Sequence, residues 1–174
     1  GDQYYGDKLV LGLNDESRES RLAAIQAVGM VKEQSAIRRL SEIIKSSDFQ
    51  DERLAATMSL GFIGNSKSIP LLNSLLDDDE PNIRWDAAIG LAKMGEDSSI
   101  PTIQNLMDRN YLSTFPELDQ NEVTKVILTA IETTTIIVDQ RFEPLLETLA
   151  SSDENLKVRN AAIKTLKFAY NKKT

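Results

Sequence analysis

The sequence predicts an all-α protein, a right-handed superhelix of about four and a half stacked helical pairs. Two observations carry the prediction. An arginine recurs at steps of 32, 31, 40 and 35 residues, with Thr124 in the fourth place. Apolar or small residues follow each anchor at helical spacing, and a repeat period in this range is typical of stacked supersecondary units. The anchors are Arg21, Arg53, Arg84, Thr124 and Arg159.

The first helix of each pair surrounds the anchor. Three residues after it comes a small or apolar residue and seven after it an apolar one, which is the inward stripe of a helix and not the alternation of a strand. Five residues before it stands an acid, which suits the positive N-terminal end of a helix. These acids are Glu16, Asp48, Asp79, Asp119 and Glu154.

A turn and a second apolar helix follow each first helix. Pro70, Pro101 and Pro144 lie at matching places in the first turn of the second helix, where a missing N–H costs nothing. Residues 133–138 form a β-branched run that alone would indicate a strand, but the surrounding period favours the end of a helix and a turn. We therefore expect one domain over residues 1–174, comprising an N-terminal half-unit (8–13), units at 14–46, 47–77, 78–108, 119–151 and 152–171, and an insertion at 109–118.

The amino-acid composition excludes several kinds of catalytic and metal site. The chain of 174 residues has no Cys and no His, which excludes disulfides, thiolate nucleophiles, the usual zinc sites and imidazole catalysis. Its net charge of −7 argues against nucleic acid, whose binding depends on Lys and Arg. No segment approaches the roughly 20 apolar residues needed to cross a bilayer. We expect no cofactor and no metal.

The first residue is Gly1, which indicates that a preceding part was left out. Two locations stay open: periplasmic or secreted after removal of a signal peptide, or cytoplasmic as part of a longer protein.

The clearest copy of the repeat is D-x-x-x-x-R-x-x-A-A-x-x-L-x-x-M-G at Asp79–Gly95, followed by I-P-x-I-x-x-L-M. This pattern resembles the HEAT-like repeat, most closely the short bacterial version also found in the phycobilisome-lyase repeat group. The resemblance covers roughly residues 14–167. It implies a ladder of ion pairs and hydrogen bonds between units, with structural roles for Arg21, Arg53, Arg84, Arg159, Glu16, Asp48, Asp79 and Glu154, broken in the fourth unit by Thr124. It also implies that partners lie along a concave surface lined by second helices.

The first candidate binding surface consists of second-helix positions off the apolar stripe, which would form a mixed polar groove running from basic to acidic. The alternative is a merely solvated face. The positions are Arg38, Arg39, Glu42, Lys45, Asn73, Ser74, Gln104, Asn105, Glu147 and Thr148.

The second candidate is the insertion, which holds Tyr111 and Phe115. Long loops with aromatic residues often serve recognition. The alternative is that these aromatic side chains fold back to fill a gap between helices.

Trp85 beside Asp86 matches the aromatic and acidic residues of HEAT-like DNA glycosylases, but the acidic chain favours a packing or surface role. No acid–base pair, phosphate loop or nucleophile motif stands out. We therefore expect a non-catalytic protein-interaction scaffold. The alternatives are an accessory subunit of a phycobilin-lyase-like enzyme and, third, a nucleic-acid binder.

Overall fold

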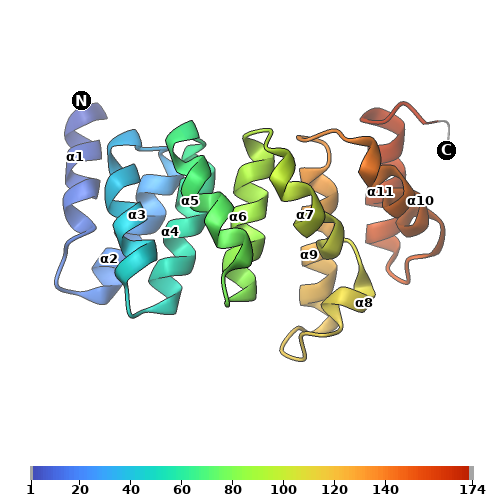
Figure 1. Cartoon of the computed structure of the whole chain (residues 1–174), viewed down its shortest axis with the longest axis horizontal. Helices are drawn as coiled ribbons and strands as arrows, with labels where there is room; N and C mark the ends of the chain where they lie inside the picture. The colour runs from blue at the N-terminus through green and yellow to red at the C-terminus, as the bar shows by residue number, and fades with distance from the viewer. Residues whose placement is uncertain (1, 173–174) are drawn as a thin grey trace. The chain divides into compact units, whose positions relative to one another are not determined.

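A computed structural model describes residues 2–172, with side chains from Tyr4 onward (Figure 1). Helices and turns make up this part of the chain, with no strand among the described residues, so the all-α prediction is confirmed. The chain divides into two compact units, residues 1–94 and 95–174. The expectation of a single domain stays a prediction.

The helices are divided between the two units. Unit 1 contains α1 (Asp2–Gly12), α2 (Arg18–Met30), α3 (Ile37–Ser46), α4 (Gln50–Ile63), α5 (Ile69–Ser74) and α6 (Pro81–Lys93). Unit 2 contains α7 (Ile100–Leu106), α8 (Arg109–Leu112), α9 (Gln120–Thr133), α10 (Glu143–Ser152) and α11 (Leu156–Phe168). Short 3₁₀ turns are η1 (Gln34–Ala36), η2 (Ser66–Ser68), η3 (Leu75–Asp77), η4 (Asp97–Ser99) and η5 (Gln140–Phe142).

In unit 1 the first helices α2, α4 and α6 lie side by side (Figure 1). Each second helix packs on the first helix that follows it in the chain, so α3 packs on α4 and α5 on α6. The helix α1 packs on α2 in the same way, which makes α1 a second helix. It begins at Asp2, so the N-terminal half-unit is longer than the predicted 8–13. Fully buried side chains from neighbouring helices form the core, among them Ile25, Leu40, Leu60, Leu72 and Leu91.

Unit 2 follows the same packing order, with α7 on α9, α10 on α11, and α9 beside α11. Its core includes the fully buried Ile103, Leu112, Ile127, Phe142 and Leu146. The β-branched run ends α9 at Thr133 and continues as a turn, as the period predicted.

Four of the second helices begin with a 3₁₀ turn. Glu33, Asn65 and Asp139 each accept a hydrogen bond from the N–H two residues on, which fixes the turn. Pro70, Pro101 and Pro144 occupy the first positions of α5, α7 and α10, as predicted, because no helical hydrogen bond is lost there.

Glycines allow α4 and α6 to approach closely. A Cβ placed on Gly61 would lie 2.9 Å from the Cα of Gly90, and one on Gly90 would lie 2.9 Å from the Cα of Gly61. Backbone therefore meets backbone at this crossing, which leaves no space for a side chain at either position.

Candidate functional site

The recurrent arginines bind main-chain carbonyl groups in the turn that precedes their own helix. Arg21 donates to the carbonyls of Asp15 and Glu16 at 2.9 and 3.0 Å. Arg84 donates to Asp78 and Asp79 at 2.6 and 3.1 Å. Arg159 repeats the arrangement with the carbonyls of Asp153 and Glu154. The arginine thus closes the turn between two helices.

Two arginines also reach an acid of the next repeat. Arg21 pairs with Glu52 at 2.8 Å, and Arg53 pairs with Asp78 at 2.5 Å. Only 5% of the Glu52 side chain is exposed, so the Arg21 guanidinium neutralises a buried carboxylate. Arg53 differs from the other arginines in donating to the carbonyl of Ile44.

The acids of the expected ladder contact the arginines mainly through main-chain atoms. Among the described residues the carboxylates of Glu16, Asp48 and Asp79 form no ion pair. The contributions of Glu16 and Asp79 to the arginine contacts are their carbonyl oxygens. The structural role of these acids in a ladder between units stays a prediction. The carboxylate that Arg53 meets stands one residue before Asp79, at Asp78, whereas Arg21 meets Glu52, four residues after Asp48.

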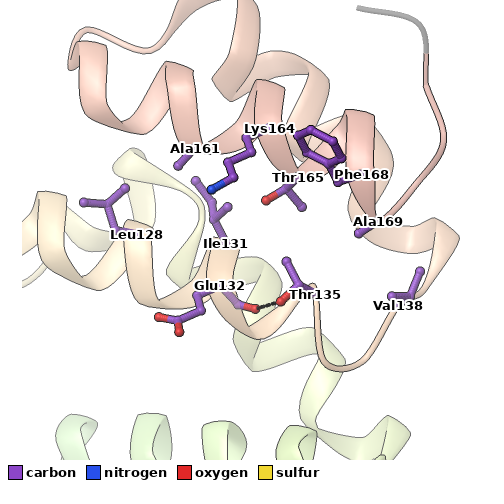
Figure 2. A pocket seen from close by; sticks show the side chains of 10 residues that line it. All are labelled: Leu128, Ile131, Glu132, Thr135, Val138, Ala161, Lys164, Thr165, Phe168 and Ala169. Carbon is purple, nitrogen blue, oxygen red and sulfur yellow. Dashed lines mark hydrogen bonds between the residues drawn. The ribbon is translucent and has the colours of Figure 1, made fainter.

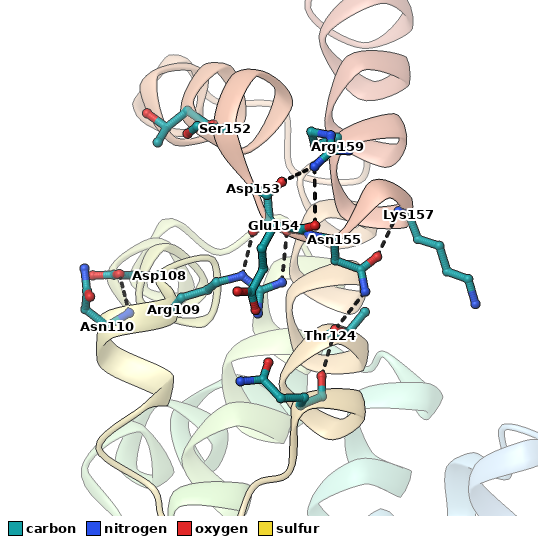
Figure 3. Close-up of polar contacts among 12 residues, drawn as sticks. Asp108, Arg109, Asn110, Thr124, Ser152, Asp153, Glu154, Asn155, Lys157 and Arg159 are labelled. Atoms are coloured by element: carbon teal, nitrogen blue, oxygen red, sulfur yellow. Dashed lines mark hydrogen bonds and ion pairs between the residues drawn. The ribbon is translucent and has the colours of Figure 1, made fainter.

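The fourth repeat has Thr124 in the arginine's place, and Arg109 from the insertion takes over its role (Figure 3). The Arg109 Nε and Nη2 donate to the two carboxylate oxygens of Asp153 at 2.7 and 2.9 Å. Its Nη1 lies 3.0 Å from a carboxylate oxygen of Glu154. Thr124 instead accepts a weak hydrogen bond from the Asn155 amide at 3.4 Å.

Asp153 is the best-enclosed acid of this network, with 1% of its side chain exposed. Burial opposes its ionisation, but the hydrogen bond from Arg109 and that from the Asn155 N–H outweigh burial and hold the pKa of the carboxyl below its ordinary value. The interaction ties α8 and the insertion to the turn between α10 and α11.

In unit 1 the second-helix candidates form one charged group on α3. Glu42 accepts hydrogen bonds from Arg38 at 3.1 Å and Arg39 at 3.2 Å. The bond from Arg39, followed by that from Arg38, lowers the pKa of the Glu42 carboxyl. Arg38, Glu42 and Lys45 are exposed. On α5, Asn73 is half-buried and the Ser74 hydroxyl donates to the carbonyl of Leu71.

In unit 2 most of the second-helix candidates already contact their own chain. The Gln104 amide donates to the carbonyl of Arg141 at 3.0 Å. Glu147 pairs with Lys172 at 3.3 Å, and the Thr148 hydroxyl donates to the carbonyl of Pro144. Asn105 is exposed.

The insertion has a structural role at two of its residues. Leu112 is fully buried and Arg109 makes the ion pairs described above. The rings of Tyr111 and Phe115 meet edge to face, with centroids 5.1 Å apart, and both side chains are half-buried. Both expectations for this segment thus keep some support, because Leu112 fills the core while the two aromatic side chains are partly accessible.

Trp85 is buried, as the packing interpretation expects, and its neighbour Asp86 is an unusual acid. Burial raises the pKa of Asp86 to about 6, against a smaller opposing effect of Lys93. No catalytic role follows, since a single carboxyl supplies only one of the two groups that acid–base chemistry usually needs.

We expect Asp86→Asn to stabilise the protein by about 1–2 kcal/mol at pH 7.5, because the folded state then no longer holds a desolvated carboxylate. A folded-state pKa above the unfolded value means that wild-type stability falls as the pH rises from about 4 to 6. The advantage of the variant should therefore disappear near pH 4. Urea unfolding at pH 4 and pH 7.5 measures the free energy of unfolding of the variant and the wild type. Asp77→Asn on the exposed surface is the control. An equal effect at pH 4 and 7.5 would contradict the assignment.

The described residues contain no group of three or more acidic side chains placed to hold a metal ion. Within the same part of the chain, every helix is too short or too polar to cross a membrane.

The comparisons with known proteins agree with this repeat architecture. Residues 37–114 match the sequence profile of the HEAT-repeat family. The chain is similar to a chain in the complex of CpcE and CpcF of phycocyanin lyase from Nostoc sp. PCC7120, with a TM-score of 0.73 and 19% identity. Residues 37–114 thus match HEAT repeats, and the fold is that of HEAT-like repeat proteins. The likeness covers 96% of this chain and 65% of the CpcE/CpcF chain, and at that identity it establishes the fold alone.

A designed armadillo repeat protein in complex with a (KR)4 peptide is also similar, at 16% identity, over 92% of this HEAT-like chain and 97% of the designed one. Its TM-score of 0.42 is too low to support an argument. Among proteins with curated descriptions, none matches the sequence.

Asp78, Asp153 and Arg109 were missed as ladder residues from the sequence of this HEAT-like protein. A signal existed for the two acids, because Asp15, Asp78 and Asp153 all stand six residues before a recurrent arginine. Arg109 lacks such a signal, since the insertion has no counterpart in the other repeats.

Proposed function

We propose that this HEAT-like protein is a non-catalytic scaffold that binds a partner protein along the surface of its second helices. The observation that carries the proposal is the α3 surface, where Arg38, Glu42 and Lys45 are exposed on a helix whose other side is buried. The buried Leu40, Ile43 and Ile44 hold this helix in place, so the charged side chains are presented from a rigid support. Rigid presentation lowers the ordering cost of binding.

The basic side chains give the α3 surface a preference for an acidic region of the partner. Arg38 and Arg39 share the single carboxylate of Glu42, and Lys45 adds a further positive charge one turn along the helix. Local positive charge in a chain of net charge −7 favours one orientation of the encounter and excludes others.

A second candidate is an accessory subunit of a lyase or modifying enzyme. The similarity to a chain of the CpcE/CpcF complex of phycocyanin lyase supports it, while the absence of Cys and His and of a paired acid–base set argues for the scaffold. In that case the same surface would hold a partner subunit or its substrate protein.

The test is affinity capture from extract of the source cells with the wild type and with Arg38→Glu/Lys45→Glu. We expect a protein that is retained by the wild type and reduced at least about tenfold by the double variant. Lys32→Glu, an exposed charge reversal after α2, is the control and should retain the protein. Equal retention by all three proteins would contradict the proposed surface. A tetrapyrrole absorbance band in the captured material would favour the lyase alternative.

A further inference from the structure

Unit 2 has a large apolar groove on its first helices, away from the second-helix candidates. It lies between α9 and α11 and has a volume of about 530 Å³. Figure 2 shows the side chains that line it, and the apolar ones include Leu128 and Ile131 from α9, Ala161 and Phe168 from α11, and Val138 from the following turn.

The apolar side chains at one end of this α9–α11 groove are open to solvent. Phe168 is 69% exposed and Val138 is 54% exposed, and Ile136 in the same turn is 51% exposed. The hydroxyl of Thr135 donates to the carbonyl of Glu132 just after the end of α9, and in this turn Ile137 is buried while Ile136 and Val138 face solvent. Contiguous exposed apolar surface of this kind is typical of an interaction site.

The groove is bordered by positive charge. The helix α11 contains Lys157, Arg159, Lys164 and Lys167 and no acidic residue, whereas the whole chain has a net charge of −7. Lys164 lines the groove directly. Helical spacing places Lys157 seven residues before Lys164 on the same side of α11, and Lys125 three residues before Leu128 on α9.

One acidic side chain that lines the groove opposes this positive charge. Glu132 lines it near the C-terminal end of α9, one turn beyond Leu128. Lysines therefore border the groove along its length, because Lys125 and Lys157 lie in the N-terminal halves of α9 and α11 and Lys164 lies one turn before Phe168.

We propose that the α9–α11 groove binds an amphipathic α-helix of a partner protein, with acidic side chains beside its apolar face that meet Lys125, Lys157 and Lys164. The apolar face of such a helix would cover Leu128, Ile131 and Phe168, as in other helix-in-groove complexes. The lysines select a helix whose apolar face is flanked by acidic side chains. This surface is separate from the α3 surface, so neither proposal depends on the other.

The probes are three fluorescein-labelled 16-residue peptides, each with Leu at positions i, i+3, i+4 and i+7. One carries Glu at positions flanking the Leu residues, the second carries Lys at those positions, and the third keeps Glu but has Ser in place of the Leu residues. By fluorescence anisotropy we expect saturable binding of the Glu peptide and at least about tenfold weaker binding of the other two.

Substitutions in the groove should change binding without unfolding the protein. Phe168→Ser should weaken the Glu peptide at least about tenfold, and Lys164→Glu should reverse the preference between the Glu and Lys peptides. Ile163→Ser is the matched control, because Ile163 is the residue before Lys164, is partly exposed, and lies on another side of α11. Unchanged thermal unfolding confirms that each variant is folded.

Several results would overturn the proposal. They are the absence of saturable binding of the Glu peptide, equal affinity for the Glu and Lys peptides, or affinity that is unaffected by Phe168→Ser. Sedimentation velocity of the chain alone adds another, since a dimer that is lost on Phe168→Ser would make a second copy the occupant of the groove.

Discussion

Arg109→Ala should destabilise the protein by about 3 kcal/mol, because it leaves the buried carboxylate of Asp153 without its partner. The carboxylate of Asp153 is 1% exposed and receives two parallel hydrogen bonds from Arg109, which the variant removes together. The partial exposure of Arg109 itself places the value near the lower end of what broken buried pairs cost. Urea unfolding followed by circular dichroism measures the loss.

Two further variants separate the ion pair from loss of packing. Arg109→Ala combined with Asp153→Asn should recover part of the stability, since no charge is then left buried. Arg109→Ala combined with Thr124→Arg should also recover part of it, because an arginine at the Thr124 place is equivalent to Arg53, which reaches Asp78. Arg38→Ala, which removes an exposed ion pair with Glu42, is the control and should cost less than about 1 kcal/mol. If Arg109→Ala costs no more than this control, Arg109 does not replace the missing arginine.

The same pair predicts a dependence on pH. The pKa of Asp153 is lowered in the folded state, so its contribution to stability is present above the unfolded pKa of about 4 and is lost as the pH falls below it. Arg109→Ala removes the main hydrogen bond that lowers the pKa of Asp153 and leaves burial, which raises it. The loss caused by the variant should therefore be largest at neutral pH and should shrink in acid.

Gly61→Val should destabilise unit 1 by about 3 kcal/mol, because its side chain would have to enter the contact between α4 and α6. The first added carbon alone would lie 2.9 Å from the Cα of Gly90, and backbone cannot move aside as a flexible side chain can. Helix propensity acts in the opposite direction, since Val is slightly better than Gly in a helix interior. The sign of the measured change therefore distinguishes the two effects.

Ala23→Val on the exposed side of α2 is the control for Gly61→Val, and it should cost less than about 1 kcal/mol through propensity alone. Amide hydrogen exchange supplies a second measurement. The Gly61→Val substitution should lower the protection of amides in α4 and α6, where the two helices separate. Unchanged protection in both helices would argue against a close backbone contact.

Much of the fold could be predicted because the same pattern of arginine and apolar residues recurs in several repeats. The residues three and seven after each arginine are mostly buried, as at Ala56, Leu60, Ala87 and Leu91. A single copy with the β-branched residues 133–138 would have been assigned to a strand, and the period corrected that assignment.

The side-chain partners could not be predicted from the same pattern. The sequence aligns residues that occupy equal places, but it does not show whether the carbonyl or the carboxylate of an acid meets the arginine. At Asp79 the carbonyl oxygen is used, and at Asp78 both the carbonyl and the carboxylate are used. Arg109 was beyond prediction for a related reason, because a contact 44 residues distant depends on the path of an unrepeated insertion.

Of the two candidate surfaces, one could be predicted from the sequence and the other could not. Exposure of Arg38, Glu42 and Lys45 on α3 followed from their place off the apolar stripe. The α9–α11 groove did not, since Leu128 and Phe168 read as ordinary apolar positions of first helices. Their accessibility depends on the distance between two neighbouring first helices, which no local pattern specifies.

The packing of each second helix on the following first helix has a consequence for protein engineering. The pairs α3 with α4, α5 with α6, and α10 with α11 share the contacts that a transferable module would need to keep intact. A cut placed between the first and second helix of one sequence repeat preserves these pairs, whereas a cut at the start of a first helix divides them. Chimeras and added repeats built from this chain should therefore be joined at the 3₁₀ turns before the second helices.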